Sequence, residues 1–386
     1  MIQWLRSVPS VLIACLGLLV STGSHADIRI GVVLSLTGAG ASVGLPEQNT
    51  VKMWPTEMAG HKVVVTLVND ASDPSAAARS ISRLVNEDKV DVIVGSSLTP
   101  TSLAMVPVAA QERIPMISLA GGGAIVEPMD ERKRWAFRLG VPERMSSDLV
   151  ADDVKRNKGA TIAVMALSSA YGDGYLKSME TSASSRGLKI VGVERFNAAD
   201  QSVTAQIAKL LLLNPDAIYV AAAGTSGTLP QIELASRGYK RRVYQTSGVA
   251  NSDFLRVAGQ AAEGMFITVL PLMVAEQLKE NDPLRGPSQE FVRTYEGRHG
   301  AGTRSGFGAS AYDSFRLIEN AAKIALRKAQ PGTEAFRVVL RDGLEQTRDL
   351  PTTTLHFAFS EADHTGLDQR SQVLAIVKGG KWTLVD

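Results

Sequence analysis

Three glycines near the start of the chain, Gly38, Gly40 and Gly44, are the first residues whose spacing could serve chemistry. A glycine-rich turn between a strand and a helix lets backbone N–H groups approach a phosphate, and dinucleotide sites use G-x-G-x-x-G with an acid about 20 residues later. Here the spacing is G-x-G-x-x-x-G, one residue longer, and an acid, Asp70, ends the next apolar run. This loop alone leaves a nucleotide site and another kind of binding loop both open.

Hydroxyl side chains follow a later apolar run, residues 90–96. Thr99 is a good N-cap and Pro100 a good first helical residue, so the sequence predicts a helix start with free N–H groups at Thr101 and Ser102. A helix N-terminus of this kind favours an anion such as a carboxylate. The same residues also fit an ordinary capped helix.

A run of glycines, Gly121, Gly122 and Gly123, ends the next apolar segment, residues 114–120. Without side chains their amides can come close to a ligand. If the two segments are neighbouring parallel strands, both loops lie at one edge of the sheet. Together they predict an anion pocket built from hydroxyl and amide donors.

Enzymatic, metal and nucleic-acid sites find little support. The five histidines show no H-x-x-x-H spacing, no G-x-S-x-G elbow is present, and Cys15 is the one cysteine. A formal charge of +2 provides no basic surface for nucleic acid. Tyr171 is a possible general acid, but beside glycine-rich turns a wall residue is favoured. We therefore expect no enzyme, no metal and no cofactor, with a nicotinamide-dependent enzyme as a remote alternative.

Residues 1–26 have the layout of a secretory signal peptide: Arg6, an apolar core, then small residues up to Ala26. Cleavage after Ala26 would leave an exported protein without cysteine. The alternative is a lipid anchor at Cys15, disfavoured because the apolar core continues past that residue. No later run approaches the roughly 20 apolar residues of a membrane span.

Short runs rich in Val and Ile alternate with helical runs along the rest of the chain, which predicts an α/β fold with mainly parallel sheets. One set of strands lies in residues 27–140 and a second in residues 160–270. Asp73 is the expected N-cap of a helix over residues 73–89. Two sets of strands predict two Rossmann-like lobes.

The expected crossings between the lobes lie at residues 140–143, at 270–273 and near 352. The helices after Pro271 have no strands of their own and are expected on the first lobe, whereas the strand-rich tail is expected on the second. The expected division is residues 27–141 plus 271–352 for the first lobe and 142–270 plus 353–386 for the second. Such a three-segment hinge predicts a cleft between the lobes, which is where ligands bind in open parallel sheets.

Six segments in this order and spacing resemble the periplasmic solute-binding proteins of branched-chain amino acid type ABC transporters. They are IRIGVVLSLTGAGASVG, NDASDPSAAARSISRLVNEDKVDVIVGS, VPVAAQERIPMIS, SSAYGDGY, AKLLLLNPDAIYVAAAG and IELASRGY. The resemblance implies the periplasmic binding protein type I fold, one small ligand between two closing lobes, and delivery to a membrane permease. It also implies that the first glycine loop borders a solute cleft and binds no nucleotide.

The resemblance further implies which residues face the ligand. The carboxylate-holding hydroxyl falls on Thr99 with Ser97 as a wall, the main-chain donors fall on Ala120, Gly121 and Gly122, and the aromatic lid falls on Tyr171. Thr225 and Ser247 would close from the second lobe. Further candidate wall residues are Ser42, Val43 and Phe307.

Three departures from the family pattern bear on the ligand. Gly122 stands where a Thr is usual, and Ala223, followed by Gly224, stands in place of an aromatic side chain. Ser247 occupies the position where amino-acid binders hold the α-ammonium with an acid. A buried ammonium without a carboxylate partner is costly. We therefore expect a carboxylate with an apolar or aromatic body and no amine, with extra room at Gly122 and Ala223.

The expected partners are a small carboxylate and an ABC transporter permease, with the protein acting as a monomer in the periplasm. Two alternatives stay open: the ligand is a branched-chain amino acid or a small amide, or the protein reports ligand occupancy to a membrane receptor as a sensor.

Overall fold

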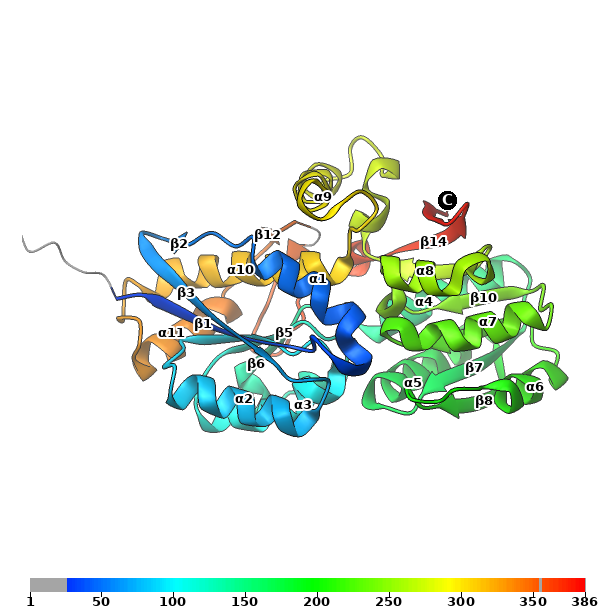
Figure 1. Ribbon diagram of the computed structural model, residues 1–386, viewed down its shortest axis with the longest axis horizontal. Coiled ribbons are helices and arrows are strands. Elements are labelled where there is room, and N and C mark those ends of the chain that lie inside the picture. The colour runs from blue at the N-terminus through cyan, green and yellow to red at the C-terminus, as the bar shows by residue number, and fades with distance from the viewer. Residues whose placement is uncertain (1–25, 354–355, 386) are drawn as a thin grey trace, which may run out of the picture.

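The computed structural model describes residues 26–353 and 356–385, and two α/β lobes lie side by side along its long axis (Figure 1). The fold class is therefore the predicted one. The segment predicted as a signal peptide and the alternative anchor Cys15 fall outside the described residues. None of the described helices combines the length and the apolar composition that crossing a membrane demands.

The first lobe is built on a six-stranded sheet in the order β2-β3-β1-β4-β5-β6, in which only β2 is antiparallel to its neighbour. Its inner strands are buried Val and Ile runs, as expected for a parallel sheet covered on both faces. Its strands are β1 (Ile28–Leu34), β2 (Glu57–Met58), β3 (His61–Asn69), β4 (Val92–Gly95), β5 (Met116–Ser118) and β6 (Ala136–Arg138).

Helices α2 (Pro74–Asn86) and α3 (Thr99–Gln111) cover one face of this sheet, and α10 (Gly306–Ala325) and α11 (Glu334–Glu345) cover the other. Helix α1 (Ala41–Val51) packs along α10. The predicted N-cap Asp73 is confirmed, because its Oδ1 accepts the Ala76 N–H at 2.6 Å. Placing α3 after β4 brings its first turn to the carboxyl edge of the sheet.

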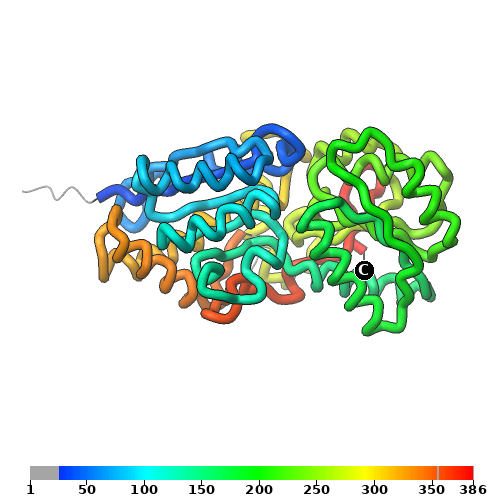
Figure 2. Tube along the Cα trace, turned by 90° about the horizontal axis from the view of Figure 1, so that it is seen from below, coloured from blue at the N-terminus to red at the C-terminus, as the bar shows by residue number. Residues whose placement is uncertain are grey.

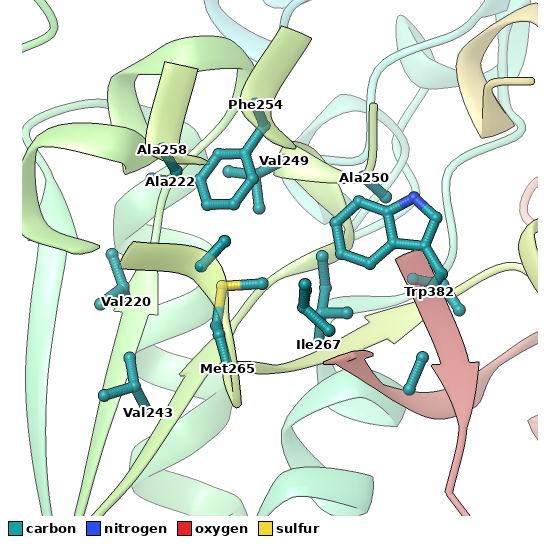
Figure 3. Packing of buried hydrophobic residues seen from close by; sticks show 14 of the residues in the cluster. Val220, Ala222, Val243, Val249, Ala250, Phe254, Ala258, Met265, Ile267 and Trp382 are labelled. Carbon is teal, nitrogen blue, oxygen red and sulfur yellow. The ribbon is translucent and has the colours of Figure 1, made fainter. Parts of the chain in front are cut away.

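The second lobe has a seven-stranded sheet in the order β15-β14-β11-β10-β9-β7-β8, with β14 and β15 antiparallel. One of its two hydrophobic cores contains Phe254 and Trp382 packed together with Val220, Val243 and Ile267 (Figure 3). The strands are β7 (Thr161–Leu167), β8 (Lys189–Phe196), β9 (Ala217–Ala221), β10 (Arg242–Gln245), β11 (Phe266–Val269), β14 (Val373–Lys378) and β15 (Lys381–Leu384). The helices are α4 (Glu143–Arg156), α5 (Ala170–Ser185), α6 (Thr204–Leu212), α7 (Thr228–Ser236) and α8 (Ser252–Ala258).

The first crossing lies where the sequence places it, between the end of β6 at Arg138 and the start of α4 at Glu143. The second crossing lies slightly later than residues 270–273. The segment η7 (Pro271–Gln277) buries Leu272, and its Gln277 bonds to Trp382 and Leu384 of β15 in the second lobe. Helix α9 (Arg285–His299) instead contacts the first lobe: the Tyr295 hydroxyl accepts from Asn49 of α1 at 3.4 Å, and the Phe291 ring lies 5.9 Å from that of Tyr312 on α10. The chain therefore passes to the first lobe between η7 and α9, and these contacts agree with the expected place of this helix.

The third crossing also lies later than residue 352. Strands β12 (Leu350–Pro351) and β13 (His356–Phe357) pair with each other, and Phe357 and Phe359 pack in the first lobe. His364 accepts the Arg138 backbone N–H through its carbonyl at 2.9 Å. Only after this contact does the chain reach β14 in the second lobe, as the red end of the trace shows (Figure 2). Residues 356–366 thus belong to the first lobe, because their aromatic rings find partners there.

Candidate ligand-binding site

A cavity lies between the lobes, at the carboxyl ends of strands from both sheets, and its empty space of about 730 Å³ includes the part open to solvent. Parallel α/β sheets place ligands at this edge. The first lobe contributes the loops after β1, β4 and β5, and the second lobe contributes the loops after β7, β8, β9 and β10. The lining residues are Ala39, Val43, Ser97, Leu98, Thr99, Pro100, Leu119, Ala120, Gly121, Leu167, Ser169, Tyr171, Ala198, Ala223, Ser226, Gly248 and Phe307.

Thr99 is the residue of this wall whose side chain is best placed to bind a ligand. Its Oγ1 is buried and has no hydrogen-bond partner among the described residues. The helix begins at Thr99 itself, with Leu98 as the N-cap, so the predicted cap is one residue off. The Ser102 N–H, expected to be free, donates to the Leu98 carbonyl at 2.9 Å. The unpaired hydroxyl and the positive end of α3 together suit an anion.

The loop after β5 is held by a buried guanidinium. Arg138 is fully buried, and its Nη1 donates to the Gly121 carbonyl at 2.6 Å and to Glu143 Oε2 at 3.2 Å. Its Nη2 donates to Thr365 Oγ1 at 3.0 Å, and Glu143 Oε1 accepts the Gly123 N–H at 2.7 Å. Because the Gly121 carbonyl is turned toward Arg138, this side chain sets the orientation of the loop that lines the cavity.

The predicted main-chain donors of this loop differ from one another. The Ala120 N–H donates to Ser118 Oγ at 3.2 Å, so it is already engaged. The N–H groups of Gly121 and Gly122 meet no acceptor within the described part of the chain. Both N–H groups are unpaired, but of these two glycines only Gly121 lines the cavity, so its amide is the one available to an anion there.

Gly122 does not provide the extra room expected from the sequence. A Cβ at this position would stand 2.2 Å from Thr99 Cγ2 and 2.6 Å from Thr99 Oγ1. The space above the glycine is therefore filled by the Thr99 side chain. Because Gly122 has no side chain, Thr99 can pack directly against this loop. Ala223 lines the cavity, as predicted.

Replacing Gly122 with alanine is expected to push Thr99 from its place. Overpacking of this kind costs about 1–3 kcal/mol of stability, and we expect at least a tenfold loss of affinity for an anionic ligand. Gly297→Ala is the matched control, because a Cβ there meets nothing within 4 Å. Calorimetric titration of both variants checks this, and a Gly122→Ala protein that binds like the control would contradict the packing argument.

Ser97 lines the cavity, but its hydroxyl is tied to a buried acid that the sequence did not single out. Its Oγ is in hydrogen-bond contact with Glu47 Oε2 and accepts the Ser35 N–H at 3.0 Å. Glu47 is fully buried on α1. Burial raises the pKa of the Glu47 carboxyl well above its usual value. The signal available in the sequence was that Glu47 is the single charged residue of residues 41–51.

Tyr171 forms part of the second-lobe wall. Its phenol donates to Thr246 Oγ1 at 3.0 Å, and its ring lies 4.7 Å from that of Tyr175 between centroids. Burial raises the pKa of the Tyr171 phenol well above its usual value, so the group stays neutral. A neutral, hydrogen-bonded phenol suits a wall residue better than a proton donor.

A second chamber adjoins the first on the hinge side, and its empty space of about 560 Å³ includes the part open to solvent. The two chambers share Leu119, Gly121, Tyr171, Gly248 and Phe307. The residues that line only the second chamber are Leu139, Gly140, Val141, Tyr175, Ser247, Ala250, Leu270, Met273, Gly306 and Ser310. Ser247 is therefore on a cavity wall, but in the chamber that Thr99 does not line.

Neither chamber is lined by a charged side chain among the described residues. The buried Arg138, Glu143 and Glu47 stand behind the walls and bond to protein atoms. The lining consists of aliphatic and aromatic side chains, hydroxyls and backbone groups. A bound ammonium would find no carboxylate in contact with it.

Three other predicted residues lie beside the cavity without lining it. Gly224, with φ of +61°, approaches the first lobe so closely that a Cβ would stand 3.0 Å from Ser42 Oγ and 3.2 Å from the Ala39 carbonyl. This contact joins η1 (Gly38–Gly40) and α1 to η4 (Gly224–Gly227) and closes the cleft. Thr225 is not on the wall either; its carbonyl accepts the Thr228 hydroxyl at 2.7 Å, and Ser226 takes its place in the lining.

The first glycine loop does not match a nucleotide site in three dimensions. Asp70 is fully buried; its Oδ1 accepts from the Ser35 hydroxyl and the Ser72 N–H, each at 2.8 Å, and its Oδ2 bonds to Ser96. A carboxylate engaged in this way is turned away from any ribose. A Cβ at Gly44 would stand 2.3 Å from the Ser35 carbonyl, so this glycine serves helix packing.

Comparison with known proteins agrees with this geometry. A family model described as periplasmic binding protein matches residues 27–381. The chain belongs to this family. An extracellular ligand-binding receptor from Rhodopseudomonas palustris has a solved structure with a TM-score of 0.90 and 37% identity, covering 93% of this chain and 99% of that one. A leucine-specific-binding protein from Salmonella typhimurium is 24% identical over 277 residues, 68% of this chain and 73% of the relative. A solute-binding protein from R. palustris, solved with benzoate, has a TM-score of 0.76 at 18% identity and covers 93% of this chain and 96% of its own.

The protein is thus a type I periplasmic binding protein of the branched-chain amino acid transporter type, as the sequence motifs indicated. Its relatives are solute-binding proteins that work with ABC transporter permeases, and this family is not an enzyme family. In the parts of the chain that the structure describes, no three His, Cys, Asp or Glu side chains gather as a metal site would require.

Several wall residues of this binding protein were missed by sequence reasoning. They are Ala39, Leu98, Pro100, Leu119, Leu167, Ser169, Ala198, Ser226 and Gly248 in the first chamber. Most of them follow the end of a strand by a few residues, which is the one signal that points to them. The family motifs emphasise polar residues, so the apolar majority of the wall has no motif of its own.

Proposed function

We propose that this periplasmic binding protein captures a small carboxylate that has an apolar or aromatic body and no α-amino group, and delivers it to an ABC transporter permease. The observation that carries the proposal is the uncharged lining of both chambers. An α-ammonium buried there would lose its hydration without gaining a carboxylate partner, at a cost of several kcal/mol.

The carboxylate is placed at the start of α3. There the unpaired Thr99 hydroxyl and the free Gly121 amide, both in the lining, offer hydrogen-bond donors. The helix dipole adds a favourable potential for a negative charge. These are neutral donors, so they hold an anion without a counter-charge on the wall.

The body of the ligand lies against Val43, Leu98, Leu119, Tyr171 and Phe307, with Ala223 leaving space on the second-lobe side. An apolar or aromatic group gains about 25 cal/mol per Å² of surface removed from water. Benzoate, the ligand of the R. palustris solute-binding protein, is a molecule of this chemical class.

The working cycle is export, capture and closure. Residues 1–26 act as a signal peptide, and the mature protein acts as a monomer with one ligand per chain. The lobes close around the ligand at three crossings, and ligand contacts from both lobes shift the population toward the closed state. Small-angle scattering with and without ligand checks this step by the expected compaction, and dimer formation would show as a doubled mass.

A thermal-shift screen of residues 27–386 tests the proposed ligand class. Ligands that bind only the folded protein raise its melting temperature. We expect shifts with benzoate, 3-phenylpropanoate or 4-methylpentanoate, and none with leucine, phenylalanine or benzamide. A shift with leucine alone would contradict the amine-free ligand and favour a branched-chain amino acid.

A further inference from the structure

Glu47 is a buried acid whose contacts reach the cavity wall through one hydroxyl. Its side chain is fully buried on α1; Oε2 contacts Ser97 Oγ, and Oε1 has no hydrogen-bond partner among the described residues. Ser97 in turn lines the ligand cavity beside Thr99. The state of Glu47 therefore determines what Ser97 can offer to a ligand.

The hydrogen-bond capacity of Ser97 makes this dependence specific. A serine hydroxyl has one hydrogen to donate and two lone pairs to accept with. One lone pair already accepts the Ser35 N–H at 3.0 Å. If Glu47 is ionised, it can only accept, so the single Ser97 hydrogen must turn toward it. If Glu47 carries a proton, that proton fills the second lone pair of Ser97, and the Ser97 hydrogen is free to point into the cavity.

The surroundings of Glu47 favour the protonated form. Burial is the main cause that raises the pKa of its carboxyl, the nearby Asp70 carboxylate raises that pKa further, and the bond with Ser97 acts in the opposite direction. No cation in the described residues is paired with Glu47.

Groups on the neighbouring elements are occupied elsewhere. On α10, which packs along α1, Asp313 accepts the Thr353 N–H at 2.8 Å and Arg316 pairs with Glu319 at 3.5 Å. On α9, the Tyr295 hydroxyl accepts from Asn49. The remaining titratable groups on these elements are Tyr312 and Lys323 on α10, Arg29 on β1, and Arg285, Glu290, Arg293, Glu296, Arg298 and His299 on α9, while η1 and η4 carry none.

We propose that Glu47 is a proton-controlled positioning residue, which in its protonated form frees the Ser97 hydroxyl to donate to the ligand carboxylate and in its ionised form withdraws that hydroxyl. The inference rests on the proposed function, because it needs an anionic ligand near Thr99 and Ser97. Ionised Glu47 also places a second negative charge close to that ligand, and both effects lower affinity in the same direction. Binding of a carboxylate is thus coupled to retention of one proton in the protein.

Stability measurements without ligand test the buried proton. The folded protein holds a proton that an unfolded glutamate releases near its ordinary pKa of about 4.3, so the folded state loses stability as pH rises from there to the folded pKa of Glu47. Glu47→Gln has no proton to lose. The difference between the melting temperature of Glu47→Gln and that of the wild type is expected to grow as the pH rises from 5. The difference is expected to level off at the folded pKa of Glu47. A melting-temperature difference that stays constant from pH 5 to pH 9 would overturn the proposal.

Calorimetric titration with benzoate between pH 6 and pH 9 tests the coupling, since benzoate stays ionised over this range. The affinity of the wild type for benzoate is expected to fall about tenfold or more as the pH rises from 6 to 9. The midpoint of this fall is expected at the pH where the difference in melting temperature levels off. Glu47→Gln is expected to keep the affinity measured at pH 6 at every pH, because its amide N–H donates to Ser97 as the protonated acid does. Ser97→Ala is expected to bind weakly at pH 6 and to lose most of the pH dependence.

The outcomes separate this inference from the proposed function. If neither benzoate nor 4-methylpentanoate binds at pH 6, the proposed function fails and the coupling fails with it. If either binds equally well at pH 6 and pH 9, or if Glu47→Gln keeps the wild-type pH profile, the proposed function stands and the coupling is wrong. A uniformly weakened Glu47→Gln variant with an unchanged pH profile would show a merely structural role.

Discussion

Replacing Thr99 with valine is expected to weaken binding of an amine-free carboxylate by about 10-fold to 100-fold, the range for a hydrogen bond to a charged group. Valine keeps the shape of threonine, and the lost hydroxyl has no partner within the described protein, so the fold loses no bond. The melting temperature without ligand is therefore expected to change little. Calorimetric titration with 3-phenylpropanoate measures the loss.

Thr181→Val is the matched control for this experiment. Thr181 is exposed on α5, and its hydroxyl donates to the Lys177 carbonyl within the helix, away from the cavity. The control is expected to bind like the wild type. If Thr99→Val binds like Thr181→Val, the carboxylate does not sit at the start of α3, and the placement of the ligand is wrong.

The second large effect is expected from Arg138→Met. Methionine fills part of the space but leaves the Gly121 carbonyl without its donor and the largely buried Glu143 without its cation. Removing one partner of a buried ion pair typically costs about 3–5 kcal/mol. We expect a strongly lowered free energy of unfolding, together with weaker ligand binding, because the loop that lines the cavity loses its anchor.

Two further variants isolate the cause of this loss. Glu127 also pairs with Arg138, at 3.4 Å, but its side chain is 65% exposed, so Glu127→Gln is expected to cost less than about 1 kcal/mol. In the double variant Arg138→Met/Glu143→Gln the uncompensated charge is gone, and part of the stability is expected to return. Equal destabilisation by Glu127→Gln and Arg138→Met in chemical denaturation would refute the buried anchor.

Local sequence signals predicted the elements that need only neighbouring residues. The Val and Ile runs, the Asp73 cap and the first crossing near Glu143 depend on short stretches, and each appears where it was expected. The carboxyl edge of parallel strands then brought Thr99, Gly121 and Tyr171 to one cavity. The alternation of strand and helix runs, together with the helix caps, was thus enough to predict the two-lobed fold and part of the cavity lining.

Most of the structural features that sequence reasoning missed depend on contacts between distant segments. The segment η7 stays with the second lobe through Leu272, and residues 356–366 join the first lobe through Phe357. The fit of Gly122 against Thr99 and the bond of Glu47 with Ser97, 50 residues apart, follow the same rule. A single sequence carries no periodicity or cap that reports such pairs, so only the packed structure reveals them.

The most direct test of the central claim is a calorimetric comparison of two matched pairs, leucine with 4-methylpentanoate and phenylalanine with 3-phenylpropanoate, at pH 6. Within each pair the molecules differ only by the α-ammonium. The uncharged walls predict that at least one amine-free acid binds and that its amino-acid counterpart binds at least a hundredfold more weakly. Equal or tighter binding of leucine or phenylalanine would contradict the account.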